Sequence, residues 1–435
     1  MRETMVRHAR MPARRQLRTF VSLAVGSQGE GILSVLSTIA LVRTTSAAEA
    51  GKVISAQSLA SVWFLLCDPR LEDAAQRYVP LQRSRDGGGA ALFGRLFRWD
   101  VGIGAGASGV GLLLTLAAYL IGGVSGDLAV LLTLAIVTAG ATSSTGSAGA
   151  AFALTGRLQR LGRVRLWCAA LLCLLALGGL LAGGPVGYLA GQAAGALVTA
   201  VVLARGALRS VHSVYGPPVP GAALPTGLVR FSAKASTATS VAAASESGLL
   251  VLAGVVGDPA LVTILKIASA PARIYTSLIS PVASMLQPRL AEAAAAGEAR
   301  RIKTDVTRSS LTLGTLGAGA LVLAIPLAGP ALGLAYGSSY AQTSIAALLL
   351  LAVACVKGGV SWSKVLPLAL GKPGWRLAFL TIEGLLCLGL LLLAARIAQE
   401  PIATAVAFGW GSLALTVIGS AFWFLALRRL VVCHD

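Results

Sequence analysis

Apolar runs of about 20 residues or more recur along this chain, separated by short polar or basic segments. A helix rises about 1.5 Å per residue, so about 20 apolar residues are enough to cross a hydrocarbon core of about 30 Å. No stretch alternates in the pattern of a membrane β-barrel strand, and backbone amides inside lipid must otherwise pair within helices. The pattern predicts an all-α polytopic membrane protein with about twelve spans. The expected spans are Leu17–Val42, Gly51–Val79, Trp99–Gly122, Asp127–Leu154, Val164–Gly183, Pro185–Ala204, Leu228–Val256, Ala260–Leu286, Ser309–Tyr336, Gln342–Leu370, Leu377–Ala395 and Pro401–Leu427.

A basic connection, Arg205 to Arg230, divides the chain into halves. Its prolines disfavour a continuous helix between the sixth and seventh spans. They are Pro217, Pro218, Pro220 and Pro225. Each half opens with a span that carries a single acid, Glu30 in the first and Glu246 in the second. Six spans on either side suggest a duplicated unit, in which two bundles rock around a central site.

The predicted organisation follows from this division. It consists of a basic cytoplasmic N-terminus (1–16), an N-terminal six-helix lobe (17–204), a cytoplasmic linker (205–227), a C-terminal six-helix lobe (228–427) and a cytoplasmic tail (428–435). The basic N-terminus is expected to precede a retained first span, because the apolar stretch after it is too long for a signal peptide.

Basic residues collect on one side of this topology. Six precede residue 19 and about 20 lie in the even-numbered connections, whereas the odd-numbered connections hold about three, Arg43, Lys52 and Arg396. Because cytoplasmic loops retain lysine and arginine, both termini are expected in the cytoplasm. The same asymmetry explains the net charge of +19 and the pI near 10.6. Anionic membrane lipids are therefore the expected partners of the basic loops, and nucleic acid is not.

The side chains that catalysis or metal binding needs do not cluster. The six cysteines lack CxxC spacing and the three histidines are scattered. Gly104, Gly106 and Gly109 match the dinucleotide fingerprint GxGxxG, but they lie in an expected helix, where small residues let helices approach closely. No GxxxxGK[ST] phosphate loop is present. We expect no enzyme activity, no cofactor and no metal, and an energy source in an Na⁺ or H⁺ gradient, the membrane potential, the substrate gradient or a partner.

Five segments together resemble a known family. They are Gly29–Gly51 with Arg43 closing the first span, Asp68–Asp73, Arg77–Tyr78, Pro281–Glu298 and Ala335–Ala341. In these segments the chain resembles bacterial polysaccharide (O-antigen type) flippases of the multidrug/oligosaccharidyl-lipid/polysaccharide (MOP) exporter superfamily. The chain departs from the pattern at Pro69 and Arg70, where many members have a glycine after the aspartate.

The resemblance implies a MATE-like MOP fold of two six-helix lobes in the bacterial cytoplasmic (inner) membrane. It also implies a flippase that moves an undecaprenyl-diphosphate-linked oligosaccharide between leaflets by alternating access, for cell-surface polysaccharide biosynthesis. Polysaccharide polymerase and glycosyltransferases are the partners that such a role implies. Because the lipid diphosphate is anionic, a cavity for it should offer cations at membrane depth.

Five basic residues lie inside the expected spans, and we predict that they bind this substrate. They are Arg70, Lys266, Arg273, Lys357 and Lys364. Lys266 and Arg273 are seven residues apart, and so are Lys357 and Lys364. Each pair is therefore expected on one face of one helix. A charge at the bilayer centre costs about 3 kcal/mol, so such residues usually face a wet cavity or a partner. Arg273 and Lys357 are the favoured phosphate contacts, whereas Lys266 and Lys364 either contact substrate or extend to the headgroups.

The inner half of the second span carries a charged cluster, in which Pro69 should kink the helix. Its members are Asp68, Arg70, Glu72, Asp73 and Arg77. Two interpretations are open: internal ion pairs at a helix end, or a cytoplasmic gate formed by Asp68, Glu72, Asp73 and Arg77. The remaining intramembrane acids, Glu30, Glu246 and Glu383, are expected to pair with a cation or to exchange a proton or sodium.

Three other functions fit parts of the pattern. A drug or small-molecule antiporter of the same superfamily would share the fold but would bind cationic drugs with carboxylates. A major-facilitator carrier also has six plus six spans, but the loop-like stretch 156–163 lies in the wrong connection and lacks the aspartate. A non-transporting scaffold for polysaccharide synthesis would tolerate neutral replacement of its intramembrane charges.

Overall fold

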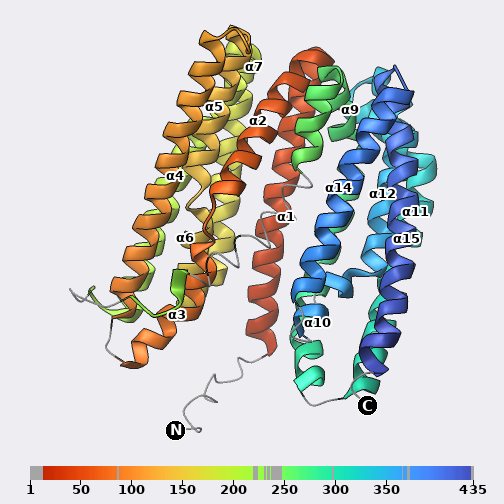
Figure 1. The fold of residues 1–435 in the computed structure, drawn as a ribbon. Coiled ribbons are helices and arrows are strands. Elements are labelled where there is room, and N and C mark those ends of the chain that lie inside the picture. Colours follow the sequence, from red (N-terminus) through yellow and green to blue (C-terminus); the bar gives the residue numbers. More distant parts are fainter. Residues whose placement is uncertain are drawn as a thin grey trace.

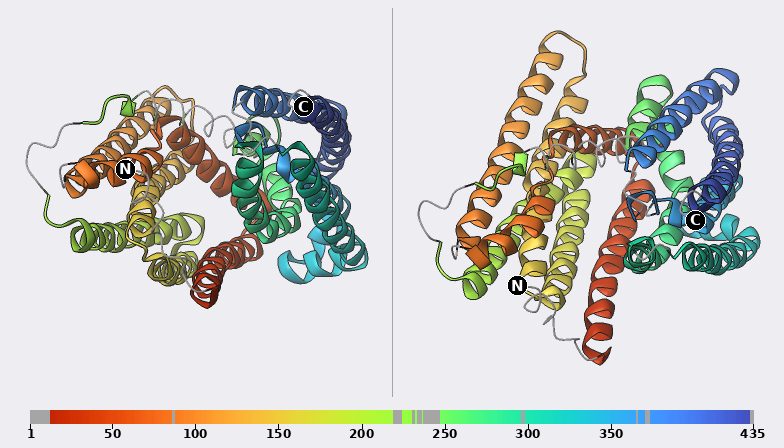
Figure 2. Two further views of the ribbon diagram at one scale, coloured as in Figure 1. Left: turned by 90° about the horizontal axis from the view of Figure 1, so that it is seen from below. Right: turned by 60° about the horizontal axis from the view of Figure 1, so that its bottom comes forward.

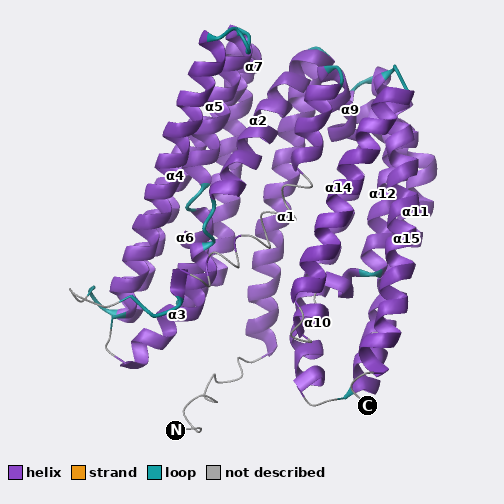
Figure 3. Ribbon diagram, in the orientation of Figure 1, coloured by secondary structure: helices purple, strands orange, loops and turns teal. Residues whose placement is uncertain are grey.

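The computed structural model describes residues 13–85, 88–218, 224–229, 232, 236, 247–295, 298–364, 366–369 and 373–432. All regular elements in this part of the chain are helical (Figure 3). Eight of the described helical segments are long and apolar enough to cross a membrane, and one of them, Leu158–Tyr215, contains two of the predicted spans. The prediction of an all-α polytopic membrane protein is confirmed. Glu246 lies outside the described residues.

The first half of the chain forms one group of helices, which includes the long α1 (Figure 1). The elements are α1 (Ala13–Thr44), α2 (Ala47–Cys67), α3 (Leu71–Arg85), α4 (Gly89–Leu120), α5 (Gly126–Thr142), α6 (Thr145–Leu154) and α7 (Leu158–Tyr215). A capping box between Ser46 and Glu49 fixes the start of α2, since each residue satisfies a free backbone N–H of the other.

The second half forms the other group, and α1 stands between the two in the views of Figures 1 and 2. Its elements are the short helix Ser247–Val256, α9 (Pro259–Ala268), α10 (Ala270–Ala295), α11 (Ala299–Tyr336), η1 (Ser338–Thr343), α12 (Ser344–Gly359), η2 (Ser361–Lys364), α13 (Leu366–Ala369), α14 (Pro373–Ile397) and α15 (Pro401–Val432). The start of α1 and the end of α15 lie at the same end of the molecule (Figure 1).

The α7 segment is a hairpin of two antiparallel helices rather than one rod. Gly183 and Gly184 have non-helical backbone angles, and Gly184 has a φ of 59°, which glycine adopts without a Cβ clash. The two arms then pack closely through small residues: a Cβ on Gly179 or Gly187 would overlap the carbonyl group of the other. The predicted separation of the fifth and sixth spans at this point is confirmed.

Several other predicted spans are interrupted. The second is divided into α2 and α3 at residues 68–70, and the fourth into α5 and α6 at Ser143 and Ser144. The eighth is divided at Ser269, two residues before Pro271, which cannot donate a helical hydrogen bond. Lys266 and Arg273 therefore belong to different helices, α9 and α10.

The prediction of a basic face on one continuous tenth helix is wrong. The helix α12 ends at Gly359, two residues after Lys357, and Lys364 lies in the separate 3₁₀ turn η2. Two successive glycines, Gly358 and Gly359, lower helix propensity at this point. Lys357 and Lys364 are therefore not two turns apart on one helix.

The prediction that the GxGxxG glycines allow close helix packing holds at one position. A Cβ on Gly104 would overlap the side-chain hydroxyl of Ser143, the residue that follows α5, so the glycine lets α4 approach the end of α5 closely. At Gly106 and Gly109 an added Cβ would meet nothing within 4 Å. They lie in α4, so the dinucleotide interpretation remains excluded for this segment.

Among the residues that the structure describes, the buried core joins the two groups at one end and is divided at the other. One apolar cluster combines residues of α1, α2, α5 and α7 with residues of α9, α11, α12, α14 and α15. At the other end the described core is divided into a cluster of α3, α4, α6 and α7 and a separate cluster of α10, α11, α13 and α15. The molecule therefore has a joined end and a divided end. Leu228, from the predicted start of the C-terminal lobe, packs in the cluster of the first group.

Candidate functional site

Close helix contacts hold the joined end together. A Cβ on Gly51 of α2 would overlap the carbonyl oxygen of Pro259, the first residue of α9. Thr263 of α9 donates a hydrogen bond of 2.8 Å to the carbonyl oxygen of Ala47. The guanidinium group of Arg43 donates to the carbonyl oxygen of Leu334 on α11. These contacts connect the two halves of the chain around the ends of α1, α2, α9 and α11.

Between the two groups, α1 contacts α10 through a reciprocal hydrogen bond. The Gln28 amide donates to the backbone oxygen of Ser277 and accepts from its hydroxyl, both at 2.9 Å. Gly29 faces α7, because a Cβ there would overlap the Leu166 side chain. The next residue, Glu30, is exposed. The structure thus places this predicted acid on the helix that lies between the groups.

Lys266 and Arg273 lie close together despite the helix break between them. The Arg273 guanidinium donates a hydrogen bond of 3.1 Å to the backbone oxygen of Lys266. Arg273 is exposed, whereas Lys266 is half-buried. Arg273 lies one helical turn from Ser277, the residue of α10 that contacts α1. Arg273 therefore lies on the helix that contacts α1, one turn before that contact, while its guanidinium extends back to Lys266.

Lys357 forms an ion pair with a predicted acid. Its Nζ lies 2.6 Å from Oε1 of Glu383, which joins α12 to α14 within the second group. The Lys357 side chain is 42% exposed and that of Glu383 is 18% exposed. Lys364 is also exposed, on η2. Lys357 and Glu383 were both predicted as intramembrane charges, but because they are far apart in the sequence their contact could not be predicted.

Arg70 pairs with three acids at the break between α2 and α3. Its guanidinium lies 3.0 Å from Glu72, 3.6 Å from Asp73 and 4.0 Å from Asp68. The Asp68 carboxylate also accepts a hydrogen bond of 2.8 Å from the Arg70 backbone N–H. Internal ion pairs, one of the two interpretations of this cluster, are thus present. Arg77 lies with its guanidinium carbon 5.5 Å from the ring centre of its neighbour Tyr78.

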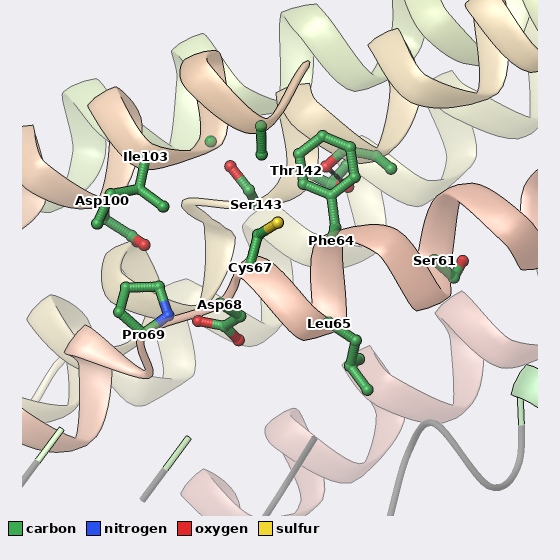
Figure 4. Close-up of a pocket in the computed structure, with 13 residues that line it drawn as sticks. Ser61, Phe64, Leu65, Cys67, Asp68, Pro69, Asp100, Ile103, Thr142 and Ser143 are labelled. Carbon is green, nitrogen blue, oxygen red and sulfur yellow. Dashed lines mark hydrogen bonds between the residues drawn. The ribbon is translucent and has the colours of Figure 1, made fainter. Parts of the chain in front are cut away.

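A cavity of about 240 Å³ lies within the first group beside this break. Its lining comes from α2 and the two residues after it, from α4 and from α5, and it includes Cys67, Asp68, Asp100 and Ser143 (Figure 4). Asp100 was not among the predicted site residues. It is only 4% exposed, and no hydrogen-bond partner contacts its Oδ2. The signal in the sequence was an acid immediately inside the third expected span, next to Trp99 at its boundary.

No protein-family model and no curated protein matches the sequence. Solved structures match its fold. An inward-facing multidrug resistance MATE family transporter of the MOP superfamily gives a TM-score of 0.74 at 11% identity, covering 95% of this chain and 98% of that chain. An outward-facing conformation of such a transporter gives 0.63 at 10% identity, covering 95% of each chain.

A third match is a MOP superfamily transporter from Pyrococcus furiosus, for which the reverse polarity of the binding pocket suggests a different function. Its TM-score is 0.67 at 12% identity, with 95% of each chain covered. This chain therefore has the two-lobed fold of MOP-superfamily MATE transporters. At identities of 10–12% the likeness establishes the fold but does not identify the transported molecule.

Proposed function

We propose that the protein is a membrane transporter that works by alternating access of its two helical lobes. The observation that carries this proposal is the arrangement of the core, which is shared by both lobes at one end and divided between them at the other. Lobes joined in this way can exchange which end is closed while each lobe keeps its own packing. The two-lobed fold of known transporters supports the same conclusion.

The described conformation corresponds to an inward-open state. The basic segments that begin α7 and α11 lie at the divided end, where the positive-inside rule favours the cytoplasm. The contacts of Gly51 with Pro259 and of Thr263 with Ala47 then close the outer side. The TM-score is higher against the inward-facing MATE structure (0.74) than against the outward-facing one (0.63), which supports this assignment.

For the cargo, ion-coupled antiport of drugs or other small molecules is the function that the comparisons favour, since the matching structures include multidrug transporters. The charges offer support as well. Two of the five predicted substrate cations, Arg70 and Lys357, are occupied by carboxylates. Glu30 is an exposed carboxylate on the helix between the lobes, where a cationic cargo would find an opposite charge.

A lipid-linked oligosaccharide is the second candidate cargo, and Arg273 is the observation that favours it. The side chain is exposed, and Arg273 lies on α10 one turn before Ser277, which contacts Gln28 of α1. An arginine fork binds phosphate oxygens in a bidentate manner. The Pyrococcus furiosus protein indicates that pocket polarity differs between transporters of this fold.

Reconstituted protein tests the proposal and separates the two cargoes. Proteoliposomes would be assayed with an imposed proton or sodium gradient for movement of ethidium, and with a fluorescent undecaprenyl-diphosphate saccharide for flipping. Antiport predicts gradient-driven ethidium movement that Glu30→Gln reduces about tenfold or more and Arg273→Gln leaves intact. The flippase predicts saccharide flipping with the opposite sensitivity. Wild-type protein that moves neither probe would contradict the transporter proposal and favour a scaffold.

A further inference from the structure

Lys357 and Glu383 form an ion pair within the C-terminal lobe. The Nζ of Lys357 lies 2.6 Å from Oε1 of Glu383. Lys357 is two residues before the end of α12, and Glu383 lies near the middle of α14. Both residues belong to helical segments that are long and apolar enough to cross a membrane. A charge at such a depth is costly, so each side chain needs an opposite charge or water.

Both charges of the pair are partly accessible. The Lys357 side chain is 42% exposed and that of Glu383 is 18% exposed. The next two residues of α12 face other helices of the lobe: a Cβ on Gly358 would lie 2.7 Å from the Tyr275 hydroxyl of α10, and a Cβ on Gly359 would lie 3.9 Å from α11. The helix α12 also packs against α15. Because these helices cover much of α12, the exposed part of Lys357 is expected to meet water inside the protein rather than acyl chains.

A partly exposed ion pair of this kind can exchange its cation. Water screens the attraction, and holding a lysine in one geometry costs side-chain entropy, so such a pair contributes little to stability. A carboxylate at membrane depth without any cation is expensive by comparison. Glu383 is therefore expected to keep a cation in every state of the protein, but that cation need not be Lys357. The lysine can leave and return, because its charge is carried on a flexible four-carbon chain.

We propose that Glu383 binds cationic cargo and that Lys357 is a competitor built into the same site. Cargo displaces the ammonium group from the carboxylate, and Lys357 returns when the cargo leaves. The empty transporter can then change state without an unpaired carboxylate in the membrane. The inference rests on the proposed transport of cationic molecules and adds a second carboxylate to Glu30. The lysine lowers the apparent affinity for cargo, because Glu383 is available only while Lys357 is displaced.

Organic cations with a delocalised charge are the expected cargo class at this pair. Such ions are weakly hydrated, as a guanidinium group is in comparison with an ammonium group. They therefore lose less on leaving water for a carboxylate at membrane depth than a compact cation does. Tetraphenylphosphonium is a suitable probe, because its charge is permanent and shielded by four aromatic rings.

Equilibrium binding of tetraphenylphosphonium to the purified full chain in lipid nanodiscs tests the pair without a transport assay. Lys357→Met should tighten binding about tenfold, because the competing ammonium group is gone. Glu383→Gln should weaken binding by a similar factor, and Lys357→Arg, which retains the charge, should bind as the wild type does. Lys303→Met is the matched control, because Lys303 is an exposed lysine of α11 in the same lobe, and it should leave binding unchanged.

Turnover separates a competitor from a purely structural ion pair. In the reconstituted ethidium assay, Lys357→Met should lower both KM and the maximal rate, since tightly held cargo leaves slowly. A structural pair predicts lower thermal stability of this variant with no gain in affinity. If Lys357→Met does not fold, Lys357→Gln replaces it, and Glu383→Gln tests the carboxylate in a chain that keeps its lysine.

The outcomes distinguish this site from the proposed function. Unchanged binding of tetraphenylphosphonium to folded Lys357→Met or to folded Glu383→Gln would overturn the competitor and leave the transport proposal standing. Wild-type protein that binds the probe through Glu383 but moves no ethidium would reject transport of cations and leave the binding site standing. Weaker binding of the fluorescent undecaprenyl-diphosphate saccharide to Lys357→Met would also overturn the inference, because Lys357 would then be a ligand for an anionic cargo.

Discussion

At the scale of single residues, Arg70 shows how one side chain stabilises a break within a membrane span. A left-handed conformation costs a non-glycine residue about 1–3 kcal/mol, so it persists only where its surroundings compensate. The Asp68 carboxylate compensates by accepting the Arg70 backbone N–H, and three carboxylates surround the guanidinium. The charge cluster and the proline could be predicted from the sequence because all of these residues are near neighbours in the chain.

We predict that Arg70→Ala destabilises the protein by about 2 kcal/mol, between the values for exposed and buried ion pairs, because it leaves three acids without their shared cation. Arg98→Ala is the control, since Arg98 is an exposed arginine whose Nε contacts only the backbone of its own helix among the bonds described. Thermal unfolding in detergent would measure both variants. An equal loss of stability in the two would show that the ion pairs at the break contribute nothing specific.

The burial of Asp100 and the contact between Lys357 and Glu383 could not be predicted from the sequence. Both charges of the pair were recognised as intramembrane residues, yet their contact depends on how α12 packs against α14. Asp100 was not predicted as a site residue, and an acid at the edge of an apolar run is usually solvated. In the structure it is buried beside a cavity that α2 and α5 line together with α4.

At the scale of elements, apolar length predicted where the helices lie but not where they break. The length of an apolar segment shows only whether it can cross the hydrocarbon core. The fourth span is equally apolar whether or not its helix breaks at Ser143 and Ser144, so length could not predict the break. The exception was the pair of glycines followed by Pro185, which marked the turn of the α7 hairpin. Prolines and glycines predict breaks well because they change the backbone itself, whereas serine and threonine act through hydrogen bonds that compete with the helix.

The α7 hairpin provides a matched test of helix packing. Gly179→Leu should destabilise the protein by about 1–3 kcal/mol or prevent folding, because its side chain must displace the backbone near Gly187. The adjacent Gly178→Leu should be tolerated, since nothing lies within 4 Å of its Cβ position. Expression and thermal unfolding in detergent would compare the two. Similar behaviour of both variants would mean that the arms of the hairpin are not closely packed.

At the scale of the whole molecule, the division into two six-helix lobes was predictable from the proline-containing connection and the count of spans. The sequence could not predict which end of the molecule is joined, because the alternative states of such a protein have the same sequence and differ by small free energies. The joined core and the contacts at Gly51 and Thr263 supply that information for the described state. If the lobes alternate, these contacts must break in every transport cycle.

A reversible cross-link between Ser55 and Gly254 tests this requirement most directly. A Cβ on Gly254 would lie 2.8 Å from the Ser55 Oγ, so cysteines at both positions, in a background without the native cysteines, have the proximity that a disulfide needs. Oxidation should stop movement of whichever probe the unmodified protein carries, and a reductant should restore it, whereas each single cysteine variant should transport under both conditions. Full transport by the oxidised, fully cross-linked protein would contradict alternating access of the two lobes.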